Sequence, residues 1–183
     1  MNLPSPLGGP TRRILIACIG NIFLGDDGFG VEVAQRLLSR RYPQGVHVVD
    51  FGIRGMELAY TLLDDYDALV LVDAVPRGGT PGTLYLIEPD RVDIDPEQRV
   101  EAGRVALDAH SMDPVKVLAF ARVLCARPIH TLIVGCEPVT ISGGEDYEEM
   151  HMGLSEPVLA AVDEAVKMID ALVEELLKAT PVL

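Results

Sequence analysis

Apolar residues along the chain cluster in short, nearly continuous runs, most of which end in glycine or an acidic residue. Runs of this kind are typical of strands that are buried on both faces of a parallel sheet. The segment 82–89 differs, because its apolar residues alternate with others after the short turn PRGGTPG. The pattern predicts strands at 13–20, 46–52, 67–75, 82–89 and 129–138.

Other segments repeat their apolar residues at the three- and four-residue spacing of amphipathic helices. This spacing predicts helices at 30–42, 55–66 and 112–124, and a long closing helix from Ser155 onward. The expected apolar stripe of the closing helix consists of Leu159, Val162, Val166, Ile169, Val173 and Leu176.

Strands that alternate with helices predict an α/β fold, a three-layer α/β/α sandwich around a five-stranded, mainly parallel mixed sheet. We expect the first strand to lie between the second and the third. The strand at 82–89 should be antiparallel, because it follows a short turn instead of a helical crossover. The 183 residues suit a single domain at 13–179, preceded by a flexible, Pro- and Gly-rich tail at 1–12.

The net charge of the chain limits the classes of molecule that it is expected to bind. The chain has 28 acidic and 15 basic side chains and a formal net charge of −13, which argues against nucleic acid as a ligand. Neither a signal peptide nor an apolar run of membrane-spanning length is visible. Cys18, Cys125 and Cys136 are scattered and odd in number, as expected of free thiols in a reducing compartment. We therefore expect a cytoplasmic protein without membrane contact, and a monomer.

The stretch IGNIFLGDDGFG, residues 19–30, combines four glycines with two adjacent aspartates. Glycine-rich loops after a strand usually bind phosphate, but these carboxylates would repel it. The stretch also lacks the close G-x-G-x-x-G of a dinucleotide site and the Lys-Ser or Lys-Thr of a P-loop. Glycines that turn the backbone tightly around carboxylates are better suited to a cation.

Acidic residues follow three of the predicted strands, which should all end at one edge of the sheet. Asp26 is expected to serve the loop or cap a helix. Asp27 is the loop carboxylate available for chemistry. Asp50 is expected to anchor the turn that follows it. Asp73 closes the apolar run ALVLV, where a carboxylate is costly unless it meets a cation or donors, so we interpret Asp73 as functional.

Among the histidines, His110 is the strongest candidate, because it lies in a predicted loop just before a helix. His151 is a weaker candidate, and His47 and His130 border strands and are interpreted as structural or surface groups. Cys136 and Glu137, at the end of the last strand, are expected in the core and at the rim. Two carboxylates and one imidazole suit a divalent transition metal, without selecting nickel over zinc or manganese.

Several segments resemble one family in order and spacing. They are IACIGNIFLGDDGFGVEVAQRL, VDFGIRGMELAYTL, LVLVDAV followed by PGTLYLIEP, DAHSMDPVKVL, and MGLSEPVLAAVDEAV. Together they cover most of the chain from Arg13 to Leu177, and they resemble the maturation endopeptidases of nickel–iron hydrogenases. The resemblance implies a phosphorylase/hydrolase-like sandwich and a peptidase that removes the C-terminal extension from the precursor of the hydrogenase large subunit.

Carried over from that family, the metal-binding and catalytic residues are Asp27, Asp73 and His110. The resemblance implies a divalent metal at the site, namely nickel supplied by the substrate, which is cut only after nickel insertion. In one version of the chemistry the metal polarises the scissile carbonyl and activates water. In another, Asp27 and Asp73 act as an acid–base carboxylate pair. Such an aspartyl endopeptidase is not of the pepsin type, because no D-T-G or D-S-G triplet occurs.

A rival hypothesis from another class uses the same three residues. A non-catalytic nickel-binding chaperone, acting as a checkpoint for the loaded precursor, would need the same ligands. The ligand set does not discriminate between the two hypotheses, whereas cleavage of a nickel-loaded precursor would.

Overall fold

A computed structural model of the chain describes residues 12–89, 129–139 and 152–179. The elements in chain order are β1 (Ile14–Ile19), the short 3₁₀ turn η1 (Asp26–Gly28), α1 (Phe29–Leu38), β2 (Val46–Gly52), α2 (Gly55–Thr61), β3 (Ala68–Ala74), β4 (Leu84–Ile87), β5 (His130–Cys136) and α5 (Glu156–Lys178). The helix predicted at 112–124 lies outside the described residues, as do His110, His151 and Cys125.

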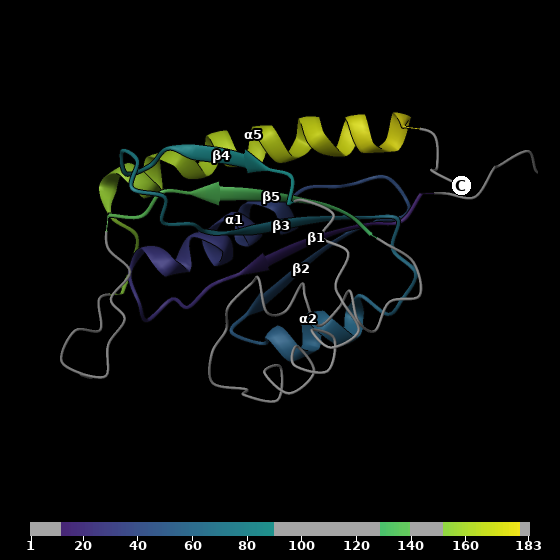
Figure 1. The fold of residues 1–183 in the computed structure, drawn as a ribbon, viewed down its shortest axis with the longest axis horizontal. Coiled ribbons are helices and arrows are strands. Elements are labelled where there is room, and N and C mark those ends of the chain that lie inside the picture. Colours follow the sequence, from purple (N-terminus) through teal and green to yellow (C-terminus); the bar gives the residue numbers. More distant parts are fainter. Residues whose placement is uncertain (1–11, 90–128, 140–151, 180–183) are drawn as a thin grey trace, which may run out of the picture.

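The sheet has five strands in the order β2-β1-β3-β5-β4 (Figure 1). β1 pairs in parallel with both β2 and β3, so that Ile14 lies opposite Val46 on one side and Ala68 on the other. β5 runs parallel to β3, and β4 is antiparallel to β5. The predicted central position of the first strand and the antiparallel direction of 82–89 are both confirmed.

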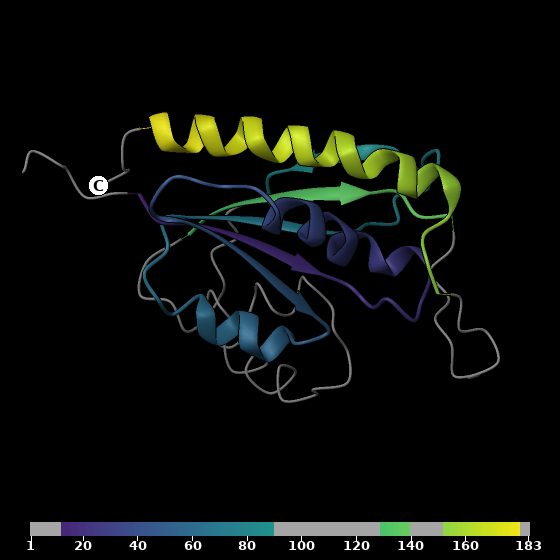
Figure 2. The same ribbon diagram turned by 180° about the vertical axis from the view of Figure 1, so that it is seen from behind.

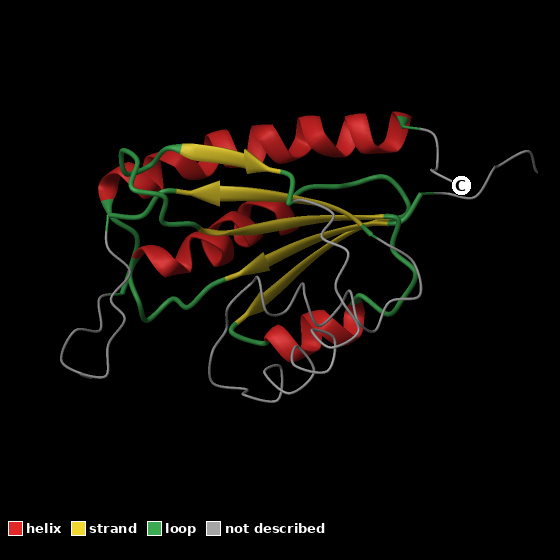
Figure 3. Cartoon of the chain, viewed as in Figure 1, coloured by secondary structure: helices red, strands yellow, loops and turns green. Residues whose placement is uncertain are grey.

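The two faces of the sheet carry separate cores, because successive side chains of a strand point to opposite faces. Along β1, Ile14, Ile16 and Cys18 join the cluster that packs against α1 and α5. Leu15, Ala17 and Ile19 join the second cluster, with Leu58 and Leu62 from the region of α2. Figures 2 and 3 show α1 and α5 on one face and α2 on the other. The predicted three-layer sandwich is therefore confirmed.

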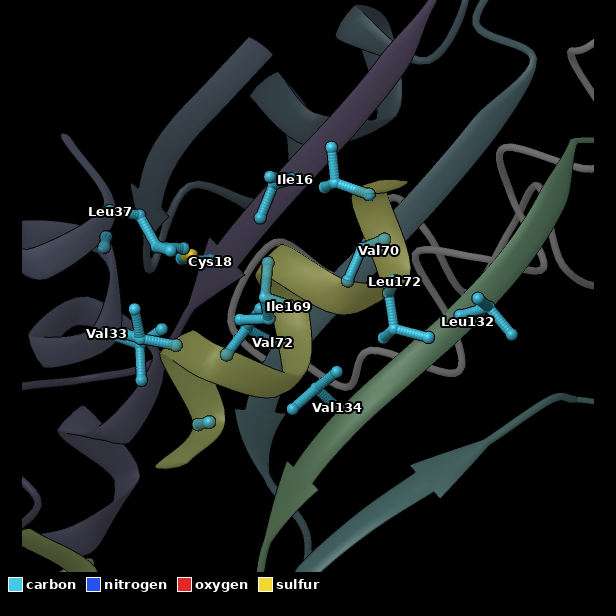
Figure 4. Packing of buried hydrophobic residues seen from close by; sticks show 14 of the residues in the cluster. Ile16, Cys18, Val33, Leu37, Val70, Val72, Leu132, Val134, Ile169 and Leu172 are labelled. Carbon is cyan, nitrogen blue, oxygen red and sulfur yellow. The ribbon is translucent and has the colours of Figure 1, made fainter. Parts of the chain in front are cut away.

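The closing helix α5 covers the first of these cores through one apolar stripe (Figure 4). Val162, Ile169 and Val173 of the predicted stripe are buried, whereas Leu159 is exposed. Assigning Leu159 to the stripe was wrong. It lies roughly 100° around the helix from Val158, which is buried in its place.

The described chain begins in contact with the end of α5. The guanidinium of Arg12 donates to the carbonyl oxygens of Leu176, at 2.7 Å, and Ala179, at 2.8 Å. These carbonyls belong to the last turn of a helix, which has no intrahelical donors for them. Arg12, the last residue of the expected tail, therefore links the start of the described chain to the C-terminal end of α5. Within the described residues, no helix combines the length and apolarity needed to cross a membrane.

Candidate active site at the carboxyl edge of the sheet

The strand order reverses direction at β1, because β2 lies on one side of it and β3 on the other. In open parallel sheets, ligands bind outside the carboxyl ends of the strands at such a switch point. Asp27 follows β1 in the turn η1, and Asp73 lies in β3 at its carboxyl end. The expectation that these two carboxylates share one edge of the sheet is therefore confirmed.

Gly20 allows the loop after β1 to fold back on itself. Its φ is +146°, and a Cβ at this position would lie 2.0 Å from the carbonyl oxygen of Asp27. The next residue, Asn21, donates its backbone N–H to the same carbonyl at 3.2 Å. Only a residue without a side chain permits this approach, so Gly20 determines where Asp27 is held.

Gly30, in the first turn of α1, allows the helix to start directly on the strand ends. A Cβ here would lie 2.1 Å from the carbonyl oxygen of Ile19 and 2.6 Å from that of Val72. These two carbonyls belong to β1 and β3, the strands on either side of the switch point. The helix therefore holds η1, and with it Asp27, at the boundary between the two strands.

The carboxylate of Asp27 is half-buried and has a defined backbone donor. Oδ2 accepts the N–H of Asn21 at 2.9 Å. Burial raises the pKa of Asp27 above its usual value, and the hydrogen bond from Asn21 opposes that rise in part. The site therefore disfavours negative charge on Asp27 when no cation is close, and a cation would relieve the penalty.

Asp73 is buried, with 7% of its surface exposed. Its Oδ1 accepts the backbone N–H of Ala74 at 2.8 Å. It lies opposite Gly135 in the pairing of β3 with β5, so the sheet backbone determines its position. Together with Asp27 it places two carboxylates at one edge, and carboxylates belong to the donor set expected for a divalent cation.

Asp26 has a different role from its neighbour. It is 3% exposed, and it accepts the N–H of Val139 at 2.8 Å, the N–H of Ser155 at 2.7 Å and the Oγ–H of Ser155 at 2.9 Å. The N-cap position of η1 is occupied by Gly25 and not by Asp26. The expected structural role in the loop is confirmed, but it is a long-range cross-link and not a cap.

The remaining strand-end groups are structural. Asp50 Oδ1 accepts the N–H of Gly52 at 2.9 Å, as expected for a turn anchor. His47 Nδ1 lies 2.8 Å from the Tyr66 hydroxyl, and His130 Nε2 lies 3.1 Å from a carboxylate oxygen of Glu88. Cys136 is buried in the core as predicted.

Glu137 is a buried anchor that the sequence interpretation placed at the rim. It is 4% exposed and accepts hydrogen bonds from the Arg77 N–H, at 2.9 and 3.0 Å, the Gly78 N–H at 3.0 Å and the Tyr85 hydroxyl at 2.7 Å. Its pairing fixes the turn after β3. The sequence did contain a signal for this role. An acidic residue follows a buried strand, and a glycine-rich turn earlier in the chain offers backbone N–H donors.

The third predicted ligand, His110, lies outside the described residues. Among the side chains in 12–89, 129–139 and 152–179, no group of three His, Cys, Asp or Glu residues is positioned to hold a metal ion. The described part of the site therefore consists of two carboxylates, and the imidazole stays a prediction.

Comparison with known proteins gives one consistent result. The family model described as hydrogenase maturation protease matches residues 31–172, which include Asp73 and begin after the loop of Asp27. A putative hydrogenase maturation protease of Methanocaldococcus jannaschii is 33% identical over 161 residues, covering 86% of this chain and 94% of the relative. The hydrogenase expression/formation protein HupM of Azotobacter chroococcum is 35% identical over 175 residues, covering 94% and 78%.

Solved structures agree with these relatives. The hydrogenase maturating endopeptidase HybD from E. coli superposes with a TM-score of 0.63 at 28% identity, covering 89% of this chain and 93% of the other. The agreement extends over most of both chains.

Proposed function

The chain belongs to the hydrogenase maturation protease family, and from this membership we propose that it removes a C-terminal extension from the precursor of a nickel–iron hydrogenase large subunit. The reaction is hydrolysis of one peptide bond. It completes maturation of the large subunit after nickel has been inserted.

One observation carries the proposal: Asp27 and Asp73 lie at the carboxyl ends of two adjacent parallel strands, at the switch point of the sheet. Both are held by backbone hydrogen bonds, from Asn21 and Ala74, and both are wholly or partly removed from water. Two poorly solvated carboxylates at one edge repel each other unless a cation or a shared proton compensates them.

In this proposal the cation is the nickel that the precursor carries. Asp27, Asp73 and His110 offer two oxygen ligands and one nitrogen ligand, a set that leaves coordination positions open for the precursor's own ligands. Nickel is then part of the substrate, and an unloaded precursor lacks the ion that joins substrate to enzyme.

Positioning is the main contribution of this chain's residues. Gly20 and Gly30 place the loop, Asn21 orients the Asp27 carboxylate, and the sheet orients Asp73. A divalent cation held by these ligands would polarise the scissile carbonyl group and lower the pKa of bound water, and both effects favour peptide hydrolysis.

We place the reaction in the cytoplasm and expect a monomeric enzyme. The buried, unpaired thiols of Cys18 and Cys136 support a reducing compartment.

The test is to incubate the protein with its cognate large-subunit precursor in nickel-loaded and nickel-free forms and to measure product masses. We expect the loaded precursor to become shorter and the unloaded one to stay intact. Asp73→Asn should abolish cleavage. Asp163→Asn, an exposed carboxylate of α5 that pairs with Arg36, is the matched control and should cleave normally.

Two outcomes would contradict the proposal. Cleavage of the nickel-free precursor would show that nickel has no part in substrate recognition. Tight binding of the loaded precursor without any shortening would assign the protein to the non-catalytic chaperones.

A further inference from the structure

Exposed apolar side chains gather on the loops at the carboxyl edge of the sheet. Ile22 and Phe23 are 44% and 47% exposed in the loop after β1, and Ile53, directly after β2, is 58% exposed. Val139, after β5, is 49% exposed, and Met152, before α5, is 73% exposed. We refer to these five side chains as the apolar rim.

Hydrogen bonds place the rim around the loop that carries Asp27. On one side, the N–H of Gly20 donates to the carbonyl of Gly52 at 3.1 Å, which brings the residue after β2, Ile53, beside the loop. On the other side, Asp26 accepts the N–H groups of Val139 and Ser155. The apolar side chains therefore flank the candidate ligand from both directions.

Phe23 is coupled most directly to Asp27, through Asn21. The backbone N–H of Asn21 donates to the Asp27 carboxylate at 2.9 Å. The side-chain oxygen of the same Asn21 accepts the N–H of Phe23 at 3.0 Å. One residue thus orients both the carboxylate and the backbone from which the exposed phenyl ring projects.

The other exposed apolar side chains in the described residues lie in or next to helices, or in the edge strand β4. Leu38, Tyr60, Leu63, Leu86 and Leu159 belong to α1, the region of α2, β4 and α5. Single exposed apolar residues are normal on protein surfaces, whereas a group around a functional site marks an interaction surface.

We propose that the apolar rim docks the segment of the precursor that flanks the scissile bond, and that this segment is apolar and carries no acidic side chain. The inference rests on the proposed function. Ile22 and Phe23 belong to the same loop as Asp27, so the docking surface is continuous with the site. The net charge of −13 opposes an acidic segment.

The test compares Phe23→Ala and Ile53→Ala with Leu38→Ala. Leu38 is 57% exposed at the end of α1, and it is the matched apolar control because α1 starts at the carboxyl edge and runs away from it. The measured quantities are kcat and KM for processing of the nickel-loaded precursor, together with precursor binding to variants that also carry Asp73→Asn.

Each rim variant should raise KM by about tenfold and leave kcat within about twofold, since a docking contact stabilises bound substrate and transition state equally. Leu38→Ala should match the wild type. All three truncations remove exposed side chains, so their thermal unfolding should stay close to that of the wild type.

Three results would overturn the inference. The first two are an unchanged KM in both rim variants while the wild type cleaves, and a rise in KM for Leu38→Ala that equals the rise in the rim variants. The third is a wild-type dimer in sedimentation that Phe23→Ala and Ile53→Ala convert to monomers while Leu38→Ala does not. The last result would assign the rim to a second copy of this chain. Failure of the proposed function looks different, because the wild type would then not cleave at all. In that case, weaker precursor binding by the rim variants would still support docking, and unchanged binding would reject it.

Discussion

Ser155 donates both its backbone N–H and its hydroxyl to the carboxylate of Asp26, across 129 positions of the sequence. The same carboxylate accepts the N–H of Val139. One buried side chain thereby joins the loop after β1 to the chain after β5 and to the start of α5. Of the two adjacent aspartates in the loop, Asp26 holds the edge together, and Asp27 is the one that we propose for the chemistry.

Asp26→Ala should lower the free energy of unfolding by about 3 kcal/mol, because it leaves two backbone donors without their acceptor and removes a charge-assisted hydrogen bond to the hydroxyl. Asp27→Asn should change it by no more than about 0.5 kcal/mol, since the amide oxygen can still accept from Asn21. Denaturant unfolding at neutral pH measures both. A larger loss for Asp27→Asn than for Asp26→Ala would reverse our assignment of the two carboxylates.

Gly30→Ala should be among the most damaging single-methyl additions to the chain. The new Cβ would lie 2.1 Å from a backbone carbonyl in β1 and 2.6 Å from one in β3, so α1 would have to move off the sheet. We expect a loss of more than about 3 kcal/mol, or no folded protein.

Gly78→Ala is the control for this substitution. Gly78 has a φ of +78° but nothing within 4 Å of its added Cβ, so only backbone strain of about 1 kcal/mol is expected. Thermal unfolding compares the two variants. Similar losses would show that α1 accommodates the added methyl group, and that close packing on the strand ends is not what requires glycine at position 30.

Glu137 should make stability depend on pH. Burial alone raises its pKa, but hydrogen bonds from Tyr85 and from the backbone of Arg77, Gly79 and Gly78 outweigh burial and hold the pKa below the ordinary 4.5. A carboxyl with a lower pKa in the folded state contributes stability above pH 4.5, and the contribution disappears as the pH falls through the folded value.

The measurement is the difference in unfolding free energy between the wild type and Glu137→Gln across the acid range. The difference should be largest near neutral pH and should shrink as the pH falls below about 4.5. A difference that stays constant down to about pH 3 would mean that the ionised form is not favoured by folding.

The arrangement of the sheet was predictable from local signals. Apolar runs around Asp50 and Asp73 marked parallel strands, and the short turn before Leu84 marked the antiparallel one. Period-two and helical patterns are local properties of the chain, and therefore the strands and helices that they predicted agree closely with the structure. The assignment of Leu159 was wrong because this residue lies beside the apolar stripe of α5, at a helical angle where an apolar side chain can be either buried or exposed.

The hydrogen-bond partners within the site were not predictable in the same way. The sequence indicated a structural role for Asp26, but not that its partners would be the distant residues Val139 and Ser155. Glu137 was assigned to the rim because its donors, in the turn after β3, lie about 60 residues earlier in the chain. Long-range hydrogen bonds leave no local pattern to identify them.

The last prediction concerns cation binding at Asp27, Asp73 and His110. Nickel titrated into the purified protein should bind, and Asp27→Asn and His110→Ala should each weaken binding by at least about tenfold, because each removes one of few ligands. Asp26→Asn should have a smaller effect in protein that remains folded, since that carboxylate is occupied by Val139 and Ser155.

Binding should weaken as the pH falls below about 6, where an imidazole takes up a proton. The raised pKa of Asp27 adds proton competition that begins at a higher pH than for an exposed aspartate. Calorimetric titration across this range is the measurement, and equal losses from Asp26→Asn and Asp27→Asn, or binding that does not change with pH, would place the cation elsewhere.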